Sequence, residues 1–261
     1  MSRSGDTLFF ETPVWVNTWA AAVGTKEGQG PLGSYFDYVT RDNRFGKKTW
    51  EQAESRMIGL ACEAALAKTG LELSQIDCAL GGDLLNQCIS TGFAARGLGL
   101  PYFGLYGACS TMAESLILGS VLVSGGFARR TLCLASSHFC SAERQYRYPL
   151  EYGGQRPPTA QWTATACGAA VLQNEKTAVG ITAATPGRVY DPGITDAGNM
   201  GAAMAQSAYE TLRTFFRDSD TGPKDYDLMV TGDLASVGHG VVTELFRRDV
   251  SCHLVGRILY H

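Results

Sequence analysis

The sequence has 261 residues, of which 45% are hydrophobic and 18% are charged. These proportions are typical of a soluble globular protein with a sizeable core, and they exclude an intrinsically disordered chain. The net charge of −3, without a long basic run, argues against a protein that binds nucleic acid.

The N-terminal segment resembles neither a targeting sequence nor a membrane anchor. Residues 1–13 lack a charged region followed by a long apolar run, so we expect no signal peptide. The apolar run at residues 116–123 is broken by Gly119 and Ser120, and it is far too short to span a bilayer. We therefore expect no transmembrane helix, so any link to a membrane has to run through a partner protein.

The chain contains eight cysteines, and no two of them form a CxxC pair. This spacing argues against a zinc knuckle and against a thioredoxin-type site. Most of these cysteines lie within apolar stretches, where a free thiol behaves as a small hydrophobic group. We expect a reducing compartment and mostly structural thiols.

Strand patterns alternate with helix patterns along the chain, which indicates an α/β architecture with buried strands. The clearest helix begins at Thr49, which forms a capping box with Gln52, and Gly70 supplies its C-terminal stop. Residues 25–48 are expected to form a long loop, and residues 137–162 are an unusual stretch rich in Arg, Tyr, Gly and Pro. In chain order, strands are predicted at 14–24, 76–80, 102–106, 131–136 and 164–172, and helices from Thr49, over 91–98, over 111–123 and over 199–216.

A short internal repeat relates two parts of the chain. Asp77 and Asp83 bracket one predicted strand, Asp227 and Asp233 bracket another, and a predicted helix precedes each strand. The match is short enough to arise by chance. If it is a true repeat, the chain has two related βαβ halves, and Asp83 and Asp233 lie at equivalent strand ends, where α/β sheets bind ligands.

Cys109 is the strongest single candidate for chemistry. It follows a predicted strand, lies between Gly107 and Thr111, and precedes a predicted helix. The free N–H groups and the positive dipole end at a helix start favour a thiolate, and they can also hold a carboxylate or an oxyanion. The alternative is a buried small residue in a tight turn.

The segment Gly107 to Thr111 resembles the nucleophile turn of the thiolase and ketoacyl synthase superfamily. Those enzymes pair the cysteine with His and Asn, or with two His, from the second half of the fold. In the matching segment, Asp233 replaces the histidine of some synthases and Ser236 replaces the following asparagine. A carboxylate cannot supply the donors of an oxyanion hole and it raises the pKa of a nearby thiol, which argues against ordinary acyl condensation.

A more specific resemblance is carried by several segments in the same order along the chain, namely 82–87, 104–111, 136–138, 142–145, 147–149, 151–154 and 226–234. Together they resemble the stage V sporulation protein AD family. The resemblance implies a thiolase-like α/β fold in a layered α-β-α-β-α arrangement, with an N-terminal half over residues 1–176 and a partial C-terminal half over residues 177–261. It also implies binding of dipicolinic acid (pyridine-2,6-dicarboxylate) and work with a membrane complex that loads this compound into the developing spore.

Several residues suit this planar, aromatic dianion. Arg144 and Arg147 can bind carboxylates bidentately, and Tyr146 or Tyr148 can stack on the ring. The start of the Cys109 helix can take the second carboxylate. The alternative for these arginines and tyrosines is a solvated surface loop.

The remaining candidates are Asp83, Asp233 and His138. The two aspartates do not suit a bare dianion, but they can accept a hydrogen bond from a protonated group or bind calcium that accompanies the ligand. We expect no other cofactor and no metal site of the protein itself. His138 follows a predicted strand and can orient Cys109 or donate to a carboxylate, although a lone histidine is more often structural. His239 is expected to start a helix.

Three functions stay open at this point: a dipicolinate-binding protein, an acyltransferase or condensing enzyme that uses Cys109, and a purely structural partner of the membrane complex. Family members continue past the end of this chain, so we expect an incomplete second half in which residues 254–260 are strand-like. The resemblance further implies a homodimer. It places the protein in the cytoplasm or peripherally on the inner membrane of the spore or forespore.

Overall fold

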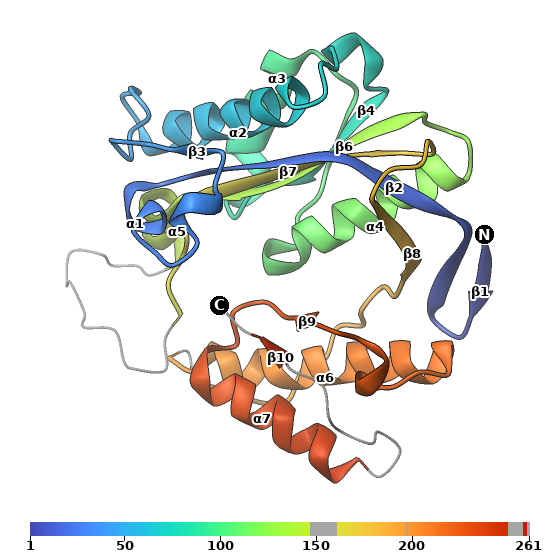
Figure 1. Cartoon of the computed structure of the whole chain (residues 1–261). Coiled ribbons are helices and arrows are strands. Elements are labelled where there is room, and N and C mark those ends of the chain that lie inside the picture. Colours follow the sequence, from blue (N-terminus) through green and yellow to red (C-terminus); the bar gives the residue numbers. More distant parts are fainter. Residues whose placement is uncertain (147–160, 197, 250–257, 260–261) are drawn as a thin grey trace. The chain divides into compact units, whose positions relative to one another are not determined.

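The structure is a computed structural model that describes residues 1–146, 161–196, 198–249 and 258–259, with the side chains of 146, 258 and 259 excepted (Figure 1). These residues form two compact units, each described by itself. The first unit holds Met1, residues 10–146 and 163–182. The second holds residues 2–9, 161–162 and the described residues from 183 onward. No helix of the described residues is long and apolar enough to cross a membrane.

A mixed β-sheet forms the centre of the first unit. Its strands are β2 (Thr7–Val23), β3 (Tyr38–Val39), β4 (Cys78–Gly82), β5 (Tyr102–Gly104), β6 (Arg130–Ser137), β7 (Ala166–Gln173) and β8 (Val179–Ala184). The main order is β2-β7-β6-β4-β5, and β3 and β8 also pair with β2. Strand β4 runs parallel to both β5 and β6, whereas β7 is antiparallel to β6 and to β2. The three parallel strands therefore end at the same edge of the sheet.

Helices cover both faces of this sheet. They are α1 (Thr25–Gly28), α2 (Trp50–Ala67), α3 (Ile89–Leu98), α4 (Thr111–Ser124) and α5 (Phe139–Tyr146), with 3₁₀ turns η1 (Gly33–Tyr35), η2 (Leu73–Gln75), η3 (Asn86–Cys88) and η4 (Ala108–Ser110). Helices α2 and α3 lie on one face and α4 lies on the other (Figure 1). The Thr49 side chain accepts from the Gln52 N–H over 3.2 Å and so caps α2, as the sequence predicts.

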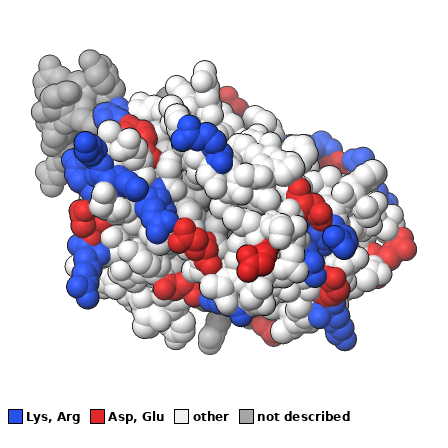
Figure 2. Space-filling model, turned by 90° about the horizontal axis from the view of Figure 1, so that it is seen from above, with Lys and Arg blue, Asp and Glu red and all other residues white. Residues whose placement is uncertain are grey.

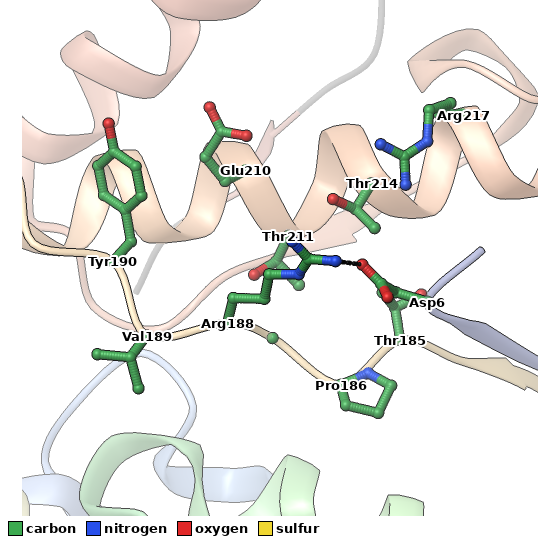
Figure 3. Close-up of a pocket in the computed structure, with 11 residues that line it drawn as sticks. Asp6, Thr185, Pro186, Arg188, Val189, Tyr190, Glu210, Thr211, Thr214 and Arg217 are labelled. Carbon is green, nitrogen blue, oxygen red and sulfur yellow. Dashed lines mark hydrogen bonds and ion pairs between the residues drawn. The ribbon is translucent and has the colours of Figure 1, made fainter.

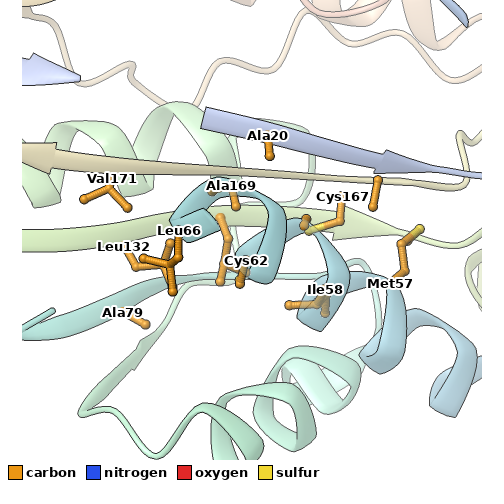
Figure 4. Packing of buried hydrophobic residues seen from close by; sticks show 14 of the residues in the cluster. Ala20, Met57, Ile58, Cys62, Leu66, Ala79, Leu132, Cys167, Ala169 and Val171 are labelled. Atoms are coloured by element: carbon orange, nitrogen blue, oxygen red, sulfur yellow. The ribbon is translucent and has the colours of Figure 1, made fainter. Parts of the chain in front are cut away.

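The core of the first unit lies between α2 and the sheet (Figure 4). Small side chains on the helix and on the facing strands let the two layers approach closely, and the larger Met57, Ile58 and Leu132 fill the space between them. The buried members of this cluster are Ala20, Ala22, Met57, Ile58, Ala61, Cys62, Ala65, Leu66, Ile76, Ala79, Leu132, Leu134, Cys167, Ala169 and Val171.

Helix α4 packs on the opposite face, where Gly119 is required. A Cβ atom at this position would lie 2.7 Å from Sγ of Cys133 and 2.8 Å from Oγ1 of Thr131, both on β6. Any side chain at residue 119 would push α4 away from the sheet. The glycine thus fixes the depth at which α4 sits, and with it the turn that precedes α4.

The second unit is a helical pair with short strands. It contains β1 (Ser2–Ser4), α6 (Met200–Ser219), η6 (Pro223–Asp225), β9 (Met229–Val230), α7 (Ala235–Arg248) and β10 (Ile258–Leu259). Strand β1 forms an antiparallel hairpin with the first residues of β2, and β9 pairs with β10 in parallel. Helices α6 and α7 enclose a small core of Ala205, Phe216, Met229, Leu234, Val242 and Phe246.

The structure confirms the predicted α/β class and has a strand or helix at each position predicted for one, although β2 begins at Thr7 and not at residue 14. Two expectations are wrong. Residues 25–48 do not form one long loop, because they contain α1, η1 and β3. His239 does not start a helix but lies inside α7, which begins at Ala235. Of the predicted strand at 254–260, only Ile258–Leu259 is described, and it forms β10.

The internal repeat has a structural counterpart. In each copy a long helix is followed by a 3₁₀ turn, a short strand and an aspartate. Asp83 Oδ1 accepts from the N–H of Leu85 over 2.8 Å, and Asp233 Oδ1 accepts from the N–H of Ala235 over 2.9 Å. Both aspartates therefore make the same local turn, which supports two related halves.

Candidate functional site

The carboxyl ends of β5, β4 and β6 bring three predicted site residues to one edge of the first unit. Asp83 directly follows β4, His138 directly follows β6, and Cys109 lies in the turn after β5. The register pairs Gly81 with Gly104 and Gly82 with Ala135, so these strand ends are neighbours. We call this edge, with Arg144 on the adjoining α5, the strand-end site. Ligands of open α/β sheets bind at such edges.

Cys109 is exposed and stands at the entrance to a helix. It lies in η4, and α4 begins two residues later at Thr111. The side chain of the N-cap residue Ser110 makes no capping hydrogen bond to α4, and the Thr111 N–H already donates to the carbonyl of Ala108, so anion binding at this helix start relies on the N–H groups of the residues that follow. The sequence prediction that Cys109 opens a helix is confirmed, and the alternative of a buried small residue is wrong.

The other described thiols are less accessible than Cys109. Cys140 is half-buried, and Cys62, Cys78, Cys88, Cys133 and Cys167 are buried. Burial raises the pKa of the Cys62 thiol and that of the Cys133 thiol to about 12. These buried groups are neutral at physiological pH and behave as small hydrophobic side chains. Cys252 lies outside the described residues.

A carboxylate lies against the turn that carries Cys109. Glu114, in the first turn of α4, reaches back to Gly107, where a Cβ atom would overlap its Oε2 atom. Only glycine at residue 107 therefore leaves room for this side chain. The helix dipole stabilises the negative charge of Glu114 at the N-terminus of α4. This charge in turn partly offsets the positive end of the dipole.

Asp83 is buried and holds the start of α3. Its side chain is 2% exposed. Oδ1 accepts from the N–H of Leu85 over 2.8 Å, and Oδ2 accepts from the N–H and hydroxyl of Thr91 over 2.7 and 2.6 Å. Both carboxylate oxygens are thus engaged by the protein itself. The structure assigns Asp83 a clear structural role, and its predicted contact with a ligand stays a prediction.

His138 is also buried, at 1% exposure, and both of its ring nitrogens have partners. The N–H of Cys140 donates to Nδ1 over 3.2 Å, so the proton of the neutral ring is on Nε2, which donates to the carbonyl of Asn43 over 2.8 Å. Burial lowers the pKa of His138, which favours this neutral form. The ring also lies 5.3 Å from the Trp50 ring. In this arrangement neither nitrogen is free to take a proton from Cys109.

Arg144 is the described basic residue of the strand-end site. It lies on α5, its side chain is 57% exposed, and it forms an ion pair with Glu51 at the start of α2. An exposed pair of this kind contributes little free energy, so the guanidinium can exchange Glu51 for another carboxylate at small cost. Arg147 and Tyr148 lie outside the described residues, as does the side chain of Tyr146.

Asp233 belongs to the second unit. It is exposed, it accepts from Ala235 through Oδ1, and its carbonyl accepts from Nε2 of Gln161 over 2.9 Å. Ser236 follows within the first turn of α7. The participation of Asp233 in ligand binding stays a prediction.

One residue of the strand-end region was missed from the sequence. Glu54 on α2 is 1% exposed and accepts from the hydroxyl of Ser136, at the end of β6, over 2.9 Å. Its spacing of three and four residues from Met57 and Ile58 places it on the buried face of α2, and this spacing is the signal that could have revealed it. Burial and the charge of Asp83 raise the pKa of Glu54 to about 7.

The outer face of α2 and α3 has no patch in which all the charges have the same sign. Figure 2 views this face from above and shows basic and acidic side chains interspersed among uncharged ones. A shallow groove of about 710 Å³ runs between the helices. Among its charged groups, Arg56 pairs with Glu63 at 2.8 Å, and Arg96 lies over the Phe93 ring at 5.4 Å.

The second unit has a cavity of its own, with a volume of about 270 Å³ (Figure 3). It lies between α6 and the extended segment 185–190, and Arg188 donates across its mouth to Asp6 over 2.6 Å. Arg217 is held by the neighbouring Asp218 through two hydrogen bonds to Oδ1. The two basic groups are therefore already neutralised by carboxylates of the same unit.

The fold is that of the thiolase-like ketosynthases. The chain is similar over 95% of its length to 3-oxoacyl-[acyl-carrier-protein] synthase III from Aquifex aeolicus VF5, of which it covers 84%, with a TM-score of 0.57 and 13% identity. It is similar over 97% of its length to cerulenin-bound OleA of Xanthomonas campestris, of which it covers 85%, with a TM-score of 0.62 and 12% identity. At these identities the likeness shows the fold alone.

The sequence narrows this class to one family. Residues 4–253 match the model of the family described as stage V sporulation protein AD. The chain is 45% identical over 243 residues to the stage V sporulation protein AD of Bacillus subtilis (strain 168), an alignment that covers 93% of this chain and 72% of the relative. The protein belongs to the stage V sporulation protein AD family, as its motifs predict.

Proposed function

We propose that this protein binds dipicolinic acid at the strand-end site and assists its uptake into the developing spore, together with other proteins of a membrane complex. Membership of the stage V sporulation protein AD family supports a role in sporulation. The observation that carries the ligand is the exposed turn before α4, which has no side-chain cap, together with the exposed Arg144 of α5, since α4 and α5 follow the two strands that pair with β4. A planar dianion needs two such anion-binding groups, one for each carboxylate.

The two carboxylates have different partners in this proposal. The first accepts from the N–H groups at the start of α4, where the helix dipole favours negative charge. The second carboxylate replaces Glu51 as the partner of the Arg144 guanidinium. A bidentate pair with a ligand carboxylate is stronger than the exposed ion pair that it replaces. The thiol of Cys109 then lies beside the ligand as a neighbour and does not attack it.

The engaged state of His138 supports binding without turnover. A condensing enzyme needs a base or a donor near its thiol, and both nitrogens of His138 already bond to backbone groups of the first unit. The alternative, an acyltransferase that uses Cys109, draws on the exposure of that thiol and on the ketosynthase fold. Mass spectrometry after incubation with acyl thioesters separates the two, because only the alternative gives an adduct that Cys109→Ala abolishes.

Calorimetric titration of dipicolinate tests the proposal, with and without calcium. The parent should bind saturably, and Arg144→Gln should weaken binding about tenfold or more because a charge-assisted hydrogen bond is lost. Cys109→Ser, which keeps the turn open, should bind like the parent, whereas Cys109→Phe should block the site. Arg96→Gln removes another exposed arginine of the same unit and serves as the matched control. No saturable binding by folded parent protein would overturn the proposal.

The proposal includes a homodimer. Strand β5 is the last strand of the sheet in the described residues, and the Phe103 side chain on it is 52% exposed. An apolar edge strand of this kind favours pairing with a second chain. Sedimentation of the parent and of Phe103→Lys tests this part, and it is supported if only the variant is monomeric.

A further inference from the structure

Glu54 joins three elements beneath the strand-end site. It projects from α2 toward the end of β6 and the start of α5 and is almost fully buried. Its Oε1 accepts from Oγ of Ser136 over 2.9 Å, and its Oε2 lies 3.2 Å from Oγ of Ser141. We call the segment from Ser136 to Ser141 the β6–α5 turn. This turn carries His138 and leads into the helix that bears Arg144.

One arrangement of the hydrogen bonds around Ser141 requires a neutral Glu54. Oγ of Ser141 lies 3.1 Å from the carbonyl oxygen of His138 as well as 3.2 Å from Glu54. A carbonyl oxygen only accepts, and a serine hydroxyl has one proton to give. If that proton goes to His138, the contact with Glu54 is a hydrogen bond only when the carboxyl is protonated and donates. Every oxygen of the group then has a partner.

The charges that face Glu54 favour the same state. Asp83, from the turn after β4, is a carboxylate whose charge raises the pKa of Glu54. Cys167 of β7 and Cys62 of α2 are buried thiols, and burial raises the pKa of both, so they are neutral. From the β6–α5 turn and α5, His138 is held neutral by burial, and Glu143 is bound to the hydroxyl of Thr163. These described neighbours add no positive charge to balance an ionised Glu54.

We propose that Glu54 is a positioning residue of the strand-end site, and that the single proton on its carboxyl couples ligand binding to pH by holding the β6–α5 turn in place. The inference rests on the proposed function, since it names the regulation of the same site. Loss of the proton leaves two buried carboxylates, on Glu54 and Asp83, and draws the Ser141 hydroxyl away from His138 to the new anion. The carbonyl of His138 then keeps only the N–H of Ala142, at 3.0 Å, and the start of α5 loosens.

The experiment compares the parent with Glu54→Gln, Glu54→Ala and the control Glu63→Gln, an exposed glutamate on the same helix. Glutamine reproduces the neutral acid, because its carbonyl accepts from Ser136 and its amide donates to Ser141. Dipicolinate is titrated calorimetrically at pH 6 and pH 8, where both carboxyl groups of the ligand are ionised. Infrared difference spectra follow the protonated carboxyl, and hydrogen exchange follows the protection of α5, both without ligand.

For the parent and for Glu63→Gln, affinity should fall about tenfold from pH 6 to pH 8, as expected when only the protonated form is competent and titrates near neutrality. Glu54→Gln should bind at both pH values within about twofold of the parent at pH 6. Glu54→Ala should bind weakly at both. The protonated-carboxyl band should vanish with rising pH in the parent and be absent from Glu54→Gln.

The outcomes separate the two proposals. No carboxyl band assignable to Glu54, or an equal pH dependence of binding in Glu54→Gln, overturns the inference even if dipicolinate binds. If no variant binds dipicolinate, the proposed function fails. The positioning role is then decided by α5: it stands if exchange protection falls with rising pH in the parent and in Glu63→Gln but not in Glu54→Gln, and it fails if protection in Glu54→Gln changes equally.

Discussion

The backbone N–H of Cys140 donates to Nδ1 of His138 over 3.2 Å, and this contact decides what the histidine can do. With Nδ1 occupied, the proton of the neutral ring is on Nε2 and is given to the Asn43 carbonyl. The ring thereby joins the end of β6 to the loop before α2. Histidine at this strand end had been expected to orient Cys109, and the structure gives it backbone partners in its place.

Replacement of His138 by alanine should therefore act on stability. The change leaves the Asn43 carbonyl without its donor and opens a cavity beside Trp50, so we expect a loss of about 2–4 kcal/mol in the free energy of unfolding, measured by urea denaturation. The rate at which iodoacetamide modifies Cys109 in the folded protein should stay within about twofold of the parent rate. A large drop in that rate, with folding intact, would show that His138 activates the thiol.

Removal of the Asp83 carboxylate should destabilise the first unit strongly. Asp83→Ala strands the N–H groups of Leu85 and Thr91 in a buried position, and we expect a cost of about 3–5 kcal/mol in urea denaturation. Asp83→Asn should cost less, because it keeps one accepting oxygen. The matched control is Asp233→Ala, which removes the equivalent but exposed aspartate of the repeat and should cost under about 1 kcal/mol. Equal effects of the two alanine variants would contradict the structural role of Asp83.

Local signals explain how much of the fold could be predicted. Thr49 caps α2 by accepting from the N–H of Gln52, three residues later, so the cap can be recognised from a few consecutive residues of the sequence. The turn before α4 could be predicted in the same way, since Gly107 and the following small residues are typical of a tight turn. Helix α5 was missed because the Arg- and Tyr-rich stretch around it resembles a loop, and its start depends on Ser141 and Glu54, which are distant in sequence.

The chemistry of the site was less accessible to prediction than its location. The sequence placed Asp83, Cys109 and His138 at strand ends, and the parallel strands do bring these ends to one edge. It could not tell which side chains are free, because Asp83 accepts from Thr91, and His138 accepts from the Cys140 N–H and donates to the Asn43 carbonyl. The contact with Asn43, which is distant in sequence, is set by tertiary packing.

Cys109 should be the first of the described thiols to react in the folded protein. It is exposed, whereas Cys140 is half-buried and burial raises its pKa, so we expect iodoacetamide to modify Cys109 at least about tenfold faster. Peptide mass spectrometry over time gives the order of modification. Cys109→Ser should remove the fast phase, and urea should make all the thiols reactive. A fast phase that survives in Cys109→Ser would contradict the exposure seen here.

The buried carboxyl of Glu54 should make stability fall as pH rises through the neutral range. Its pKa is raised from 4.5 to about 7 in the folded protein, so between these values the folded chain holds a proton that the unfolded chain has released. Stability is then complete below the unfolded pKa and is lost progressively up to the folded pKa, by about 3 kcal/mol in all. Urea denaturation from pH 5 to pH 8 measures this slope.

Glu54→Gln isolates that slope from every other titrating group. The variant cannot ionise but keeps a donor for Ser141 and an acceptor for Ser136, so its free energy of unfolding relative to the parent should rise by about 2–3 kcal/mol from pH 5 to pH 8. Glu63→Gln changes an exposed carboxylate of the same helix and should track the parent throughout. A constant difference between Glu54→Gln and the parent would mean that Glu54 is ionised across this range. Its contacts with Ser136 and Ser141 would then both be donated by the serines, and the proton would have no part in holding the β6–α5 turn.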